Sequence, residues 1–506
     1  MSGVFLSGAA MAAAESSASA PANPPGCERA SAQDCLGLAM TAMGGRSRLA
    51  AIHNVQLEAI GHTLLTEQSY RQEPFISSYE RGVQTLDFAN SRVVRNTHLV
   101  WPEADDPKSA EIDSTFIATL QGGVYHQKEG DIPASRADLD SVSDALSLSP
   151  ERLLLTAAAA PDLHYEATVM LRSTPHAALA FQWHGLSVRI LLKAYNHLPD
   201  AWESTRPFND FWYAWGDVAQ RVYLDNWVLV DGVVYPTNRI EERNGVLWKS
   251  LQVLDTHFNV AVDDKRFAMD ADTAAKSAQG KGWERAFSDK NQLTLAPGVD
   301  LYQGAWNTTL IKQDDGVLVL EAPISGSYMQ GILAQAHKSY AEAPIKAVIS
   351  TSDSWPHTAG VREAVAAQLP VYVLDLNRPL LEKLVSSPHA LRPDRLQTAP
   401  QAARWEVVSG KRVIGSGANR VELYPLRGAA TERQYMVYFP AHKLLYASDT
   451  LSIDPQSHAL YDPQLMHEVL QAVMREHLAV DTVYAMHQQP TPWREIVERL
   501  KASTKS

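Results

Sequence analysis

Alternating apolar and polar positions dominate the first half of the chain. Residues 55–61 (VQLEAIG) alternate in the way that predicts a half-buried strand. A short helix is expected before it, over residues 36–43, and a second helical pattern at 150–158 interrupts the later strands. Many strands separated by turn residues, with few helices, favour one large curved antiparallel sheet. The further strand-like runs lie at residues 75–81, 91–99, 115–120, 123–127, 167–172, 178–183, 187–192, 221–230, 232–239 and 246–260.

From residue 293 onward the pattern changes to strands that alternate with helices. Two of the helices begin with a side-chain acceptor followed by proline, Asp462-Pro463 and Thr491-Pro492, a combination typical of helix starts. Pattern alone predicts a mixed α/β second half, so the fold class expected for the whole chain is α+β. Strands are predicted at 299–302, 307–311, 317–323, 345–349, 371–375, 420–426, 435–439 and 443–448, and helices at 328–340, 361–368, 378–385, 464–477 and 493–502.

The length of 506 residues is sufficient for two or three hydrophobic cores. A polar, weakly periodic segment at residues 270–291 divides the two patterns and predicts a linker. The expected organisation is therefore a leader at 1–35, an antiparallel sheet domain at 36–269, the linker at 270–291 and a second domain at 292–506.

Charge and hydropathy exclude several classes of partner. The chain has 45 basic and 57 acidic residues, a net charge of −12, and no long basic run. We therefore expect no binding to nucleic acid. No apolar stretch reaches the roughly 18 residues of a transmembrane segment. A small-molecule or lipid-like ligand is the expected partner, and the oligomeric state is not predicted.

The N-terminus favours export. Residues 4–14 (VFLSGAAMAAA) are similar to the apolar core of a signal peptide, although no basic residue precedes them. The chain is thus either periplasmic or secreted, or it begins with a flexible tail. Its two cysteines, Cys27 and Cys35, fit a small disulfide loop in an oxidising compartment, with two free thiols as the alternative.

The loop at residues 351–362 (TSDSWPHTAGVR) is the first place to look for chemistry. It follows an apolar run that predicts a buried strand, and it leads into a helix. Ligands of α/β proteins collect beyond the carboxyl ends of strands. The loop resembles the signature of the metallo-β-lactamase fold, His-x-His-x-Asp-His between a strand and a helix. Thr351, Trp355, His357 and Gly360-Val361-Arg362 keep that frame.

The resemblance implies a degenerate metal centre. Serine hydroxyls replace the first two histidines, proline replaces the aspartate, and alanine replaces the third histidine of the first metal site. Serine is a poor zinc ligand, and proline and alanine offer no side-chain donor. The changed positions are Ser352, Ser354, Pro356 and Ala430, and the retained ones, all of the second site, are His357, Asp449 and His487.

Two imidazoles and one carboxylate are enough to bind one zinc or another divalent metal and to leave open positions for water. The resemblance then implies an αββα four-layer sandwich and hydrolysis of an ester, amide or thioester, with His357 and Asp449 as catalytic residues. Two alternatives stay open: a metal-free domain that only binds a ligand, and metal-free acid/base chemistry by the three retained residues. Asp353 is expected to point away from the site, and Glu321 stands where the family usually has an aspartate.

The first half resembles the lipoprotein-carrier (LolA-like) type of half-barrel. The similarity rests on Met43-Gly44-Gly45 with Arg48-Leu49, on Gly216-Asp217-Val218 and on residues 231–237 (DGVVYPT). It implies a concave face that holds an apolar ligand, so the alternative function is a non-catalytic periplasmic carrier. Four neighbouring aromatic residues either contact such a ligand or belong to the core, namely Phe211, Trp212, Tyr213 and Trp215.

Overall fold

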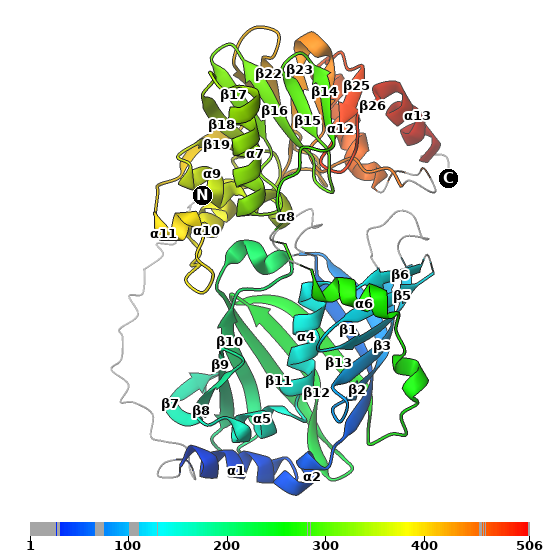
Figure 1. Cartoon of the computed structure of the whole chain (residues 1–506), viewed down its shortest axis with the longest axis vertical. Helices are drawn as coiled ribbons and strands as arrows, with labels where there is room; N and C mark the ends of the chain where they lie inside the picture. Colours follow the sequence, from blue (N-terminus) through cyan, green and yellow to red (C-terminus); the bar gives the residue numbers. More distant parts are fainter. Residues whose placement is uncertain are drawn as a thin grey trace, which may run out of the picture.

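The computed structural model describes residues 27, 31–65, 75–100, 111–128, 130–280, 282–283, 285–454, 458, 460 and 462–503. The apolar segment expected to direct export, residues 4–14, lies outside these ranges. The described residues form two bodies, one above the other in Figure 1: a first body with one large antiparallel sheet, and a second body with two smaller sheets. No helix in the described ranges is both long enough and apolar enough to span a membrane.

The sheet of the first body has thirteen strands and consists of two meanders. Strands β1 to β6 run outward to one edge, the chain crosses to the opposite edge, and β7 to β13 return to the centre. There β13 pairs with β1, with Val55 opposite Phe258. The strands are β1 (Asn54–Leu64), β2 (Ser77–Asp87), β3 (Arg92–Val100), β4 (Glu111–Thr119), β5 (Gly123–Gln127), β6 (Gly130–Pro133), β7 (His164–Leu171), β8 (Thr174–Trp183), β9 (Leu186–Lys193), β10 (Pro199–Arg206), β11 (Val218–Val230), β12 (Val233–Arg243) and β13 (Val246–Phe258).

Two helices, α4 (Arg136–Ser147) and α5 (Leu153–Ala159), carry the chain from one edge of this sheet to the other. A capping box starts α4: the hydroxyl of Ser135 accepts from the backbone N–H of Asp138, whose carboxylate accepts from the N–H of Ser135. Leu139 on its apolar side packs against strands β2, β3 and β4. Figure 1 shows α4 between the two halves of the curved sheet.

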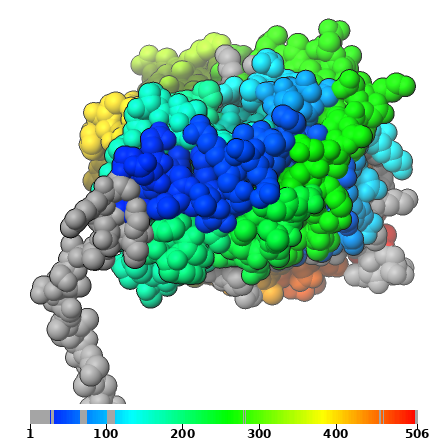
Figure 2. Space-filling model, turned by 90° about the horizontal axis from the view of Figure 1, so that it is seen from below, coloured from blue at the N-terminus to red at the C-terminus, as the bar shows by residue number. Residues whose placement is uncertain are grey.

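The N-terminal helices cover the end of the first body that faces away from the second. α1 (Ala32–Ala42) and α2 (Arg46–Ala50) share a core with α5 and with strands β8 and β9. Cys27 and Cys35 form a disulfide, as one of the two sequence interpretations predicted. Figure 2 shows these helices in dark blue, seen from below.

The segment expected to be a linker, residues 270–291, contains a helix that belongs to the first body. This helix, α6 (Ala271–Ala278), contacts β5 and β6. The hydroxyl of Ser277 accepts a hydrogen bond of 2.9 Å from the backbone N–H of Gly123. The polar composition is therefore that of a helix lying near the β6 edge of the sheet, with its other side in solvent. The short helix η2 (Asp264–Phe267) precedes it.

The second body contains a seven-stranded and a six-stranded sheet. The first runs in order from β14 to β20 and changes from antiparallel to parallel at β17. The second runs from β21 to β26 and is parallel only between β24 and β25. The strands are β14 (Gln292–Ala296), β15 (Val299–Tyr302), β16 (Thr308–Gln313), β17 (Gly316–Leu320), β18 (Ile345–Ser350), β19 (Pro370–Leu374), β20 (Arg404–Val408), β21 (Arg412–Ile414), β22 (Val421–Pro425), β23 (Tyr435–Phe439), β24 (Leu444–Tyr446), β25 (Thr482–Tyr484) and β26 (Thr491–Pro492).

Buried side chains form three successive cores in the second body. One joins α7, α9, α10 and α11 to the seven-stranded sheet, the next lies between the two sheets, and the last joins the six-stranded sheet to α12 and α13. Every residue of β17 is buried, which is typical of a strand covered on both faces. The helices are α7 (Gly326–Ser339), α8 (Trp355–Thr358), α9 (Val361–Ala366), α10 (Arg378–Ser386), α11 (Arg395–Thr398), η3 (Pro440–His442), α12 (Pro463–Arg475) and α13 (Trp493–Ser503).

An aromatic cluster joins the two bodies. Trp355 of α8 packs edge-on against Trp212 and Trp215 of the short helix η1 (Phe211–Trp215), with ring centroids 4.7 and 5.2 Å apart. Trp212 and Trp355 are only 2% and 3% exposed. The tryptophans of η1 therefore belong to the core between the bodies. This agrees with the interpretation that these aromatic residues are part of the core and do not contact a ligand.

The proline-containing loop at residues 386–401 makes a second contact with the first body. The backbone N–H of Asp217 donates to the carbonyl of Pro388 (2.8 Å), and the carboxylate of Asp217 accepts from Ala390 (2.6 Å) and Leu391 (3.1 Å). Gly216 precedes this aspartate with φ of +65°, and a Cβ there would lie 2.4 Å from the carbonyl oxygen of Pro388. Only glycine fits here without strain, because it has no Cβ and readily adopts a positive φ.

Replacing Trp212 by alanine tests the aromatic cluster. Truncation of a buried tryptophan typically costs about 3–5 kcal/mol, and we expect W212A to lower the free energy of unfolding by that order. Guanidinium denaturation followed by circular dichroism measures the change. Tyr195→Ala removes a ring that is 71% exposed and serves as the control, with an expected change below about 0.5 kcal/mol. Equal stabilities of the two variants would contradict a structural role of the cluster.

Candidate metal centre

Three strand ends deliver the candidate residues to one place. Strand β18 leads into the loop at 351–362 and into α8, which carries His357. Asp449 follows β24, and His487 follows β25. Because β18 belongs to the seven-stranded sheet and β24 and β25 to the six-stranded sheet, the site spans both sheets at the carboxyl ends of their strands.

The imidazoles of His357 and His487 and the carboxylate of Asp449 converge. Nε2 of His357 lies 3.3 Å from Nε2 of His487 and 3.6 Å from Oδ2 of Asp449. Nε2 of His487 lies 3.2 Å from Oδ1 of Asp449. Among the described residues, only this group brings together three His, Cys, Asp or Glu side chains whose donor atoms all lie within 4.8 Å of one another.

His487 is held in a defined orientation. Its Nδ1 donates to the backbone carbonyl of Ala305 over 2.7 Å, which leaves the Nε2 lone pair directed at the other two groups. The buried amide of Asn307 donates to the carbonyls of Ala485 (2.8 Å) and Gln488 (3.2 Å). These bonds fix the turn on which His487 lies. In the sequence Asn307 marks the start of a predicted strand after a small-residue turn, and its supporting role comes from the structure.

His357 is oriented from the opposite side. Its Nδ1 lies 3.1 Å from the hydroxyl oxygen of Ser352, which also accepts a hydrogen bond of 3.3 Å from the backbone N–H of Ser354. Ser352 stands where the resemblance expects a metal ligand, yet here it contacts the retained histidine. The backbone N–H of Asp449 donates to the side-chain oxygen of Gln434 over 3.0 Å. Each of the three convergent residues thus has a second partner that limits its movement.

The environments of the two histidines differ. Burial lowers the pKa of His357 to about 4, so its imidazole is neutral at pH 7. Burial also acts to lower the pKa of His487, but the hydrogen bond and the charge of Asp449 outweigh it, and the pKa is raised. Burial opposes ionisation of Asp449, but the neighbouring His357 and His487 outweigh it and lower its pKa. An ionised carboxylate beside a neutral imidazole is a donor set suited to a divalent metal.

The spacing of the three groups fits a tetrahedral centre. Ligand atoms at about 2.05 Å from a zinc ion lie about 3.3 Å from one another. The observed separations of 3.2, 3.3 and 3.6 Å are close to this value. The side chains of His487 and Asp449 are 33% and 22% exposed and that of His357 is 3% exposed, so the site opens to solvent on the side of His487.

The changed positions contribute no ligand to this group. Pro356 accepts a hydrogen bond from the backbone N–H of Ile324 through its carbonyl, and the backbone N–H of Ala430 donates to the carboxylate of Glu468. Asp353 lies 3.6 Å from the guanidinium of Arg433 and outside the convergent group, as expected. The structure therefore brings together His357, Asp449 and His487 and leaves the other candidate positions as structural residues.

Glu321 is a buried acid behind the site. It lies at the end of β17, has a φ of +76° and is 0% exposed. Its carboxyl group is hydrogen-bonded by the hydroxyl and the backbone N–H of Thr351 and by Tyr446. Burial raises the pKa of Glu321 to about 8, so the group is neutral at pH 7. It anchors the start of the loop that carries His357, and its departure from the family's aspartate was its only signal in the sequence.

A neutral buried acid makes stability depend on pH. In the unfolded chain Glu321 ionises near its ordinary pKa of 4.5, whereas in the folded protein it keeps its proton up to about pH 8. As the pH rises between these values, the folded protein therefore loses stability relative to the unfolded chain, by at most about 1.4 kcal/mol per pH unit. Glu321→Gln keeps a neutral group there, and its stability relative to the unchanged protein should rise from pH 5 to pH 8.

Chemical denaturation at several pH values measures this difference. Glu342→Gln, at an exposed position of the same body, is the matched control and should show no such trend. A pH-independent difference between E321Q and the unchanged protein would contradict a proton on Glu321.

A groove of about 840 Å³ borders the site on the side of His487. Gln303, Ser452 and Arg499 are among the residues that line it. The open face of the convergent group is thus reached from this groove.

Comparisons with known proteins gave similarities only among solved structures. No model of a protein family and no curated protein matches the chain. A metallo-beta-lactamase from Pontibacter korlensis is 14% identical. The match covers 42% of this chain and 99% of that one, with a TM-score of 0.33. A metallo-beta-lactamase from Erythrobacter litoralis is 16% identical (42% of this chain, 96% of that one, TM-score 0.33). The inverting sec-alkylsulfatase Pisa1 from Pseudomonas sp. is 14% identical; the match covers 42% of this chain and 40% of that one, with a TM-score of 0.31.

These similar structures are metallo-beta-lactamases and an alkylsulfatase. Their TM-scores are all below 0.5.

Proposed function

We propose that residues 292–503 form a four-layer αββα domain of the metallo-β-lactamase type that binds one divalent metal and hydrolyses an ester, amide or thioester. The observation that carries this proposal is the triangle of donor atoms on His357, Asp449 and His487. Two features support the fold: helices pack on the outer faces of both sheets, and the three residues follow strands at the same ends of these sheets.

The proposed metal is bound by Nε2 of His357, Nε2 of His487 and the carboxylate of Asp449. When bound, a divalent ion supplies a Lewis acid and lowers the pKa of water. The chain's own residues hold the ligands in place: the carbonyl of Ala305 fixes the ring of His487, and the hydroxyl of Ser352 contacts the ring of His357. The groove beside His487 gives a substrate access to the open side.

A metal-free role has its own supporting observation. The raised pKa of His487 and its separation of 3.2 Å from Asp449 also fit an ion pair, in which a charged imidazole occupies the position of a metal. In that arrangement the second body is a scaffold or an acid/base site. The first body is then the functional part, as a lipoprotein-carrier-type half-barrel with a ligand under α4.

Metal content separates the two proposals. We expect about one zinc, iron or manganese ion per chain in the purified protein, and loss of this metal in a variant that combines His357→Ala and His487→Ala. Elemental analysis by mass spectrometry gives the content. Loading with Co²⁺ gives a second measurement, because a site with nitrogen and oxygen ligands of low coordination number produces visible absorption bands that depend on both histidines.

His337→Ala is the matched control, since this histidine is exposed on α7, away from the convergent group. It should keep the metal and the Co²⁺ spectrum of the unchanged protein. Absence of metal after incubation with excess zinc or cobalt would retire the metallohydrolase proposal and favour the metal-free role.

We further propose that the chain is exported to the periplasm or secreted. The disulfide between Cys27 and Cys35 supports this proposal, because such bonds persist in oxidising compartments. A fusion of residues 1–35 to alkaline phosphatase, which is active only after export, should be active in intact bacteria. The same fusion with Leu6→Arg and Ala10→Arg, which interrupt the apolar segment, should be inactive. Equal activity of both fusions would contradict export through this segment.

A further inference from the structure

Both histidines of the convergent group are connected to one short helix of the first body. This helix, η1, lies between β10 and β11 and has four aromatic side chains among its five residues. Two of its rings contact the helix that carries His357, and a third ring begins a row of aromatic contacts that ends at His487. The two histidines are therefore supported from outside the body to which they belong.

The first set of contacts ends beside His357. Trp212 and Trp215 of η1 pack edge-on against Trp355, which is 3% exposed, and these three tryptophans form the His357 row. Trp355 is the first residue of α8, the four-residue helix that also contains His357. The one residue between them, Pro356, has a fixed φ. A displacement of the ring of Trp355 therefore displaces the backbone of His357.

The second set of contacts ends at the ring of His487. The ring centroid of Phe211 lies 4.8 Å from that of Trp283, and Trp283 packs edge-on against Trp306 at 5.2 Å. Trp306 in turn packs edge-on against the imidazole of His487 at 5.9 Å, and these four rings form the His487 row. Ala305, next to Trp306, supplies the carbonyl that accepts from Nδ1 of His487. The segment that holds Trp306 thus also fixes the orientation of this histidine.

Trp283 bridges the two bodies within the His487 row. It lies in the segment between α6 and β14, in a turn outside any helix or strand, and its side chain is only partly buried. One of its ring contacts is with Phe211 of the first body and the other is with Trp306 of the second. A partly exposed ring of this kind can be truncated without opening a core, so its contribution can be measured in a folded protein.

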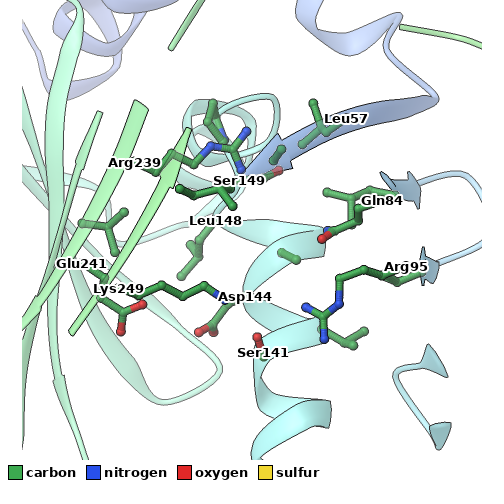
Figure 3. A pocket seen from close by; sticks show the side chains of 18 of the residues that line it. Leu57, Gln84, Arg95, Ser141, Asp144, Leu148, Ser149, Arg239, Glu241 and Lys249 are labelled. Carbon is green, nitrogen blue, oxygen red and sulfur yellow. The ribbon is translucent and has the colours of Figure 1, made fainter. Parts of the chain in front are cut away.

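Buried charges of the first body fix the position of η1. Asp210 caps this helix: its carboxylate accepts from the backbone N–H of Trp212 over 2.9 Å and from the guanidinium of Arg243 over 2.6 Å. Arg243 also donates to Glu241 over 2.7 Å. Glu241 lines the cavity of about 250 Å³ between α4 and the curved sheet, where Figure 3 shows it. The helix is therefore attached to the large sheet.

We propose that η1 and Trp283 position His357 and His487, so that the geometry of the metal centre in the second body depends on contacts with the first. The proposal rests on the metal-binding function proposed above and assigns positioning residues to that same site. Groups that orient metal ligands typically contribute about 10- to 100-fold to metal affinity. The His357 row and the His487 row act in this way, through the two histidines.

The Co²⁺ affinity of Trp283 variants tests the proposal. Trp283→Ala should weaken Co²⁺ binding by about tenfold or more and shift its visible absorption bands, because the ring of His487 is then less well held. Trp283→Phe keeps a ring at this position and should bind Co²⁺ nearly as tightly as the unchanged protein. Trp183→Ala removes a partly buried ring on β8 and is the matched control, which should change neither property. Unaltered Co²⁺ affinity in folded W283A would overturn the proposal.

A second variant measures the contribution of η1. Phe211→Ala should also weaken Co²⁺ binding. The variant that combines Phe211→Ala with Trp283→Ala should bind Co²⁺ no more weakly than W283A alone, because both rings belong to one row. Additive losses would show that Phe211 does not act through Trp283 and would overturn the His487 row as a connection between the bodies.

Hydrogen exchange in the metal-free protein separates this proposal from the proposed function. The backbone N–H of Asn307 donates to the carbonyl of Met486 over 2.8 Å, between the neighbours of Trp306 and His487. In W283A the amides of residues 304–308 should exchange about tenfold faster or more, whereas those of β17 should exchange as in the unchanged protein. Mass spectrometry of peptides covering these segments gives the rates.

Equal exchange of residues 304–308 in W283A and in the unchanged protein would overturn the positioning role, whatever the metal content shows. Absence of metal from the unchanged protein would instead retire the metallohydrolase proposal. In that case the exchange rates still decide whether Trp283 holds the segment beside His487.

Discussion

The face-to-face packing of the two smaller sheets is the constraint on which the convergent group depends. His357 is connected to the seven-stranded sheet, and Asp449 and His487 follow strands of the six-stranded sheet, so no single sheet contains the group. Leu318, Ile349, Val437 and other buried side chains between the sheets fix their separation. A shift of one sheet by an ångström would change the distances between donor atoms by a similar amount, and cores packed as densely as organic crystals resist such shifts.

The loop that carries His357 is held from two directions. On one side Trp355 is enclosed by the tryptophans of η1 in the first body, and on the other Thr351 is bonded to the buried carboxyl group of Glu321. Ser352 and Ser354 complete the contacts within the loop. The hydroxyl of Ser352 thus helps to order the loop through contacts within it.

Local pattern predicted much of this fold. The alternation in the first half indicated antiparallel strands, and Asp462 caps the start of α12 as predicted. Thr491 and Pro492 were wrongly expected to start a helix: they pair with β25 as strand β26, and α13 begins at Trp493. The helix α6 was missed because its Ala- and Lys-containing sequence has no buried face strong enough to distinguish it from a linker. The role of Asn307 depends on contacts with residues far away in the chain. Such contacts leave no mark in the spacing of a single sequence.

The site was predicted through resemblance more than through spacing. His357, Asp449 and His487 are separated by long stretches, and only the alignment with a known signature placed them together. The largely buried ion pair between Glu241 and Arg243 in the first sheet was not foreseen, since charged positions on the inner face of a strand look the same in sequence as charged positions on its outer face. Burial of a charge becomes visible only when the sheet curves and a helix covers it.

The pairing of β1 with β13 has a consequence for the synthesis of the protein. Val55 and Phe258, about two hundred residues apart in the chain, are paired where β1 meets β13 in the middle of the first sheet. A nascent chain therefore exposes the unpaired edge of β1 until more than half of the polypeptide has left the ribosome. Contacts of such long range slow folding and leave strand edges open to aggregation in the meantime. Folding of the first body therefore cannot be completed before β13 has been synthesised.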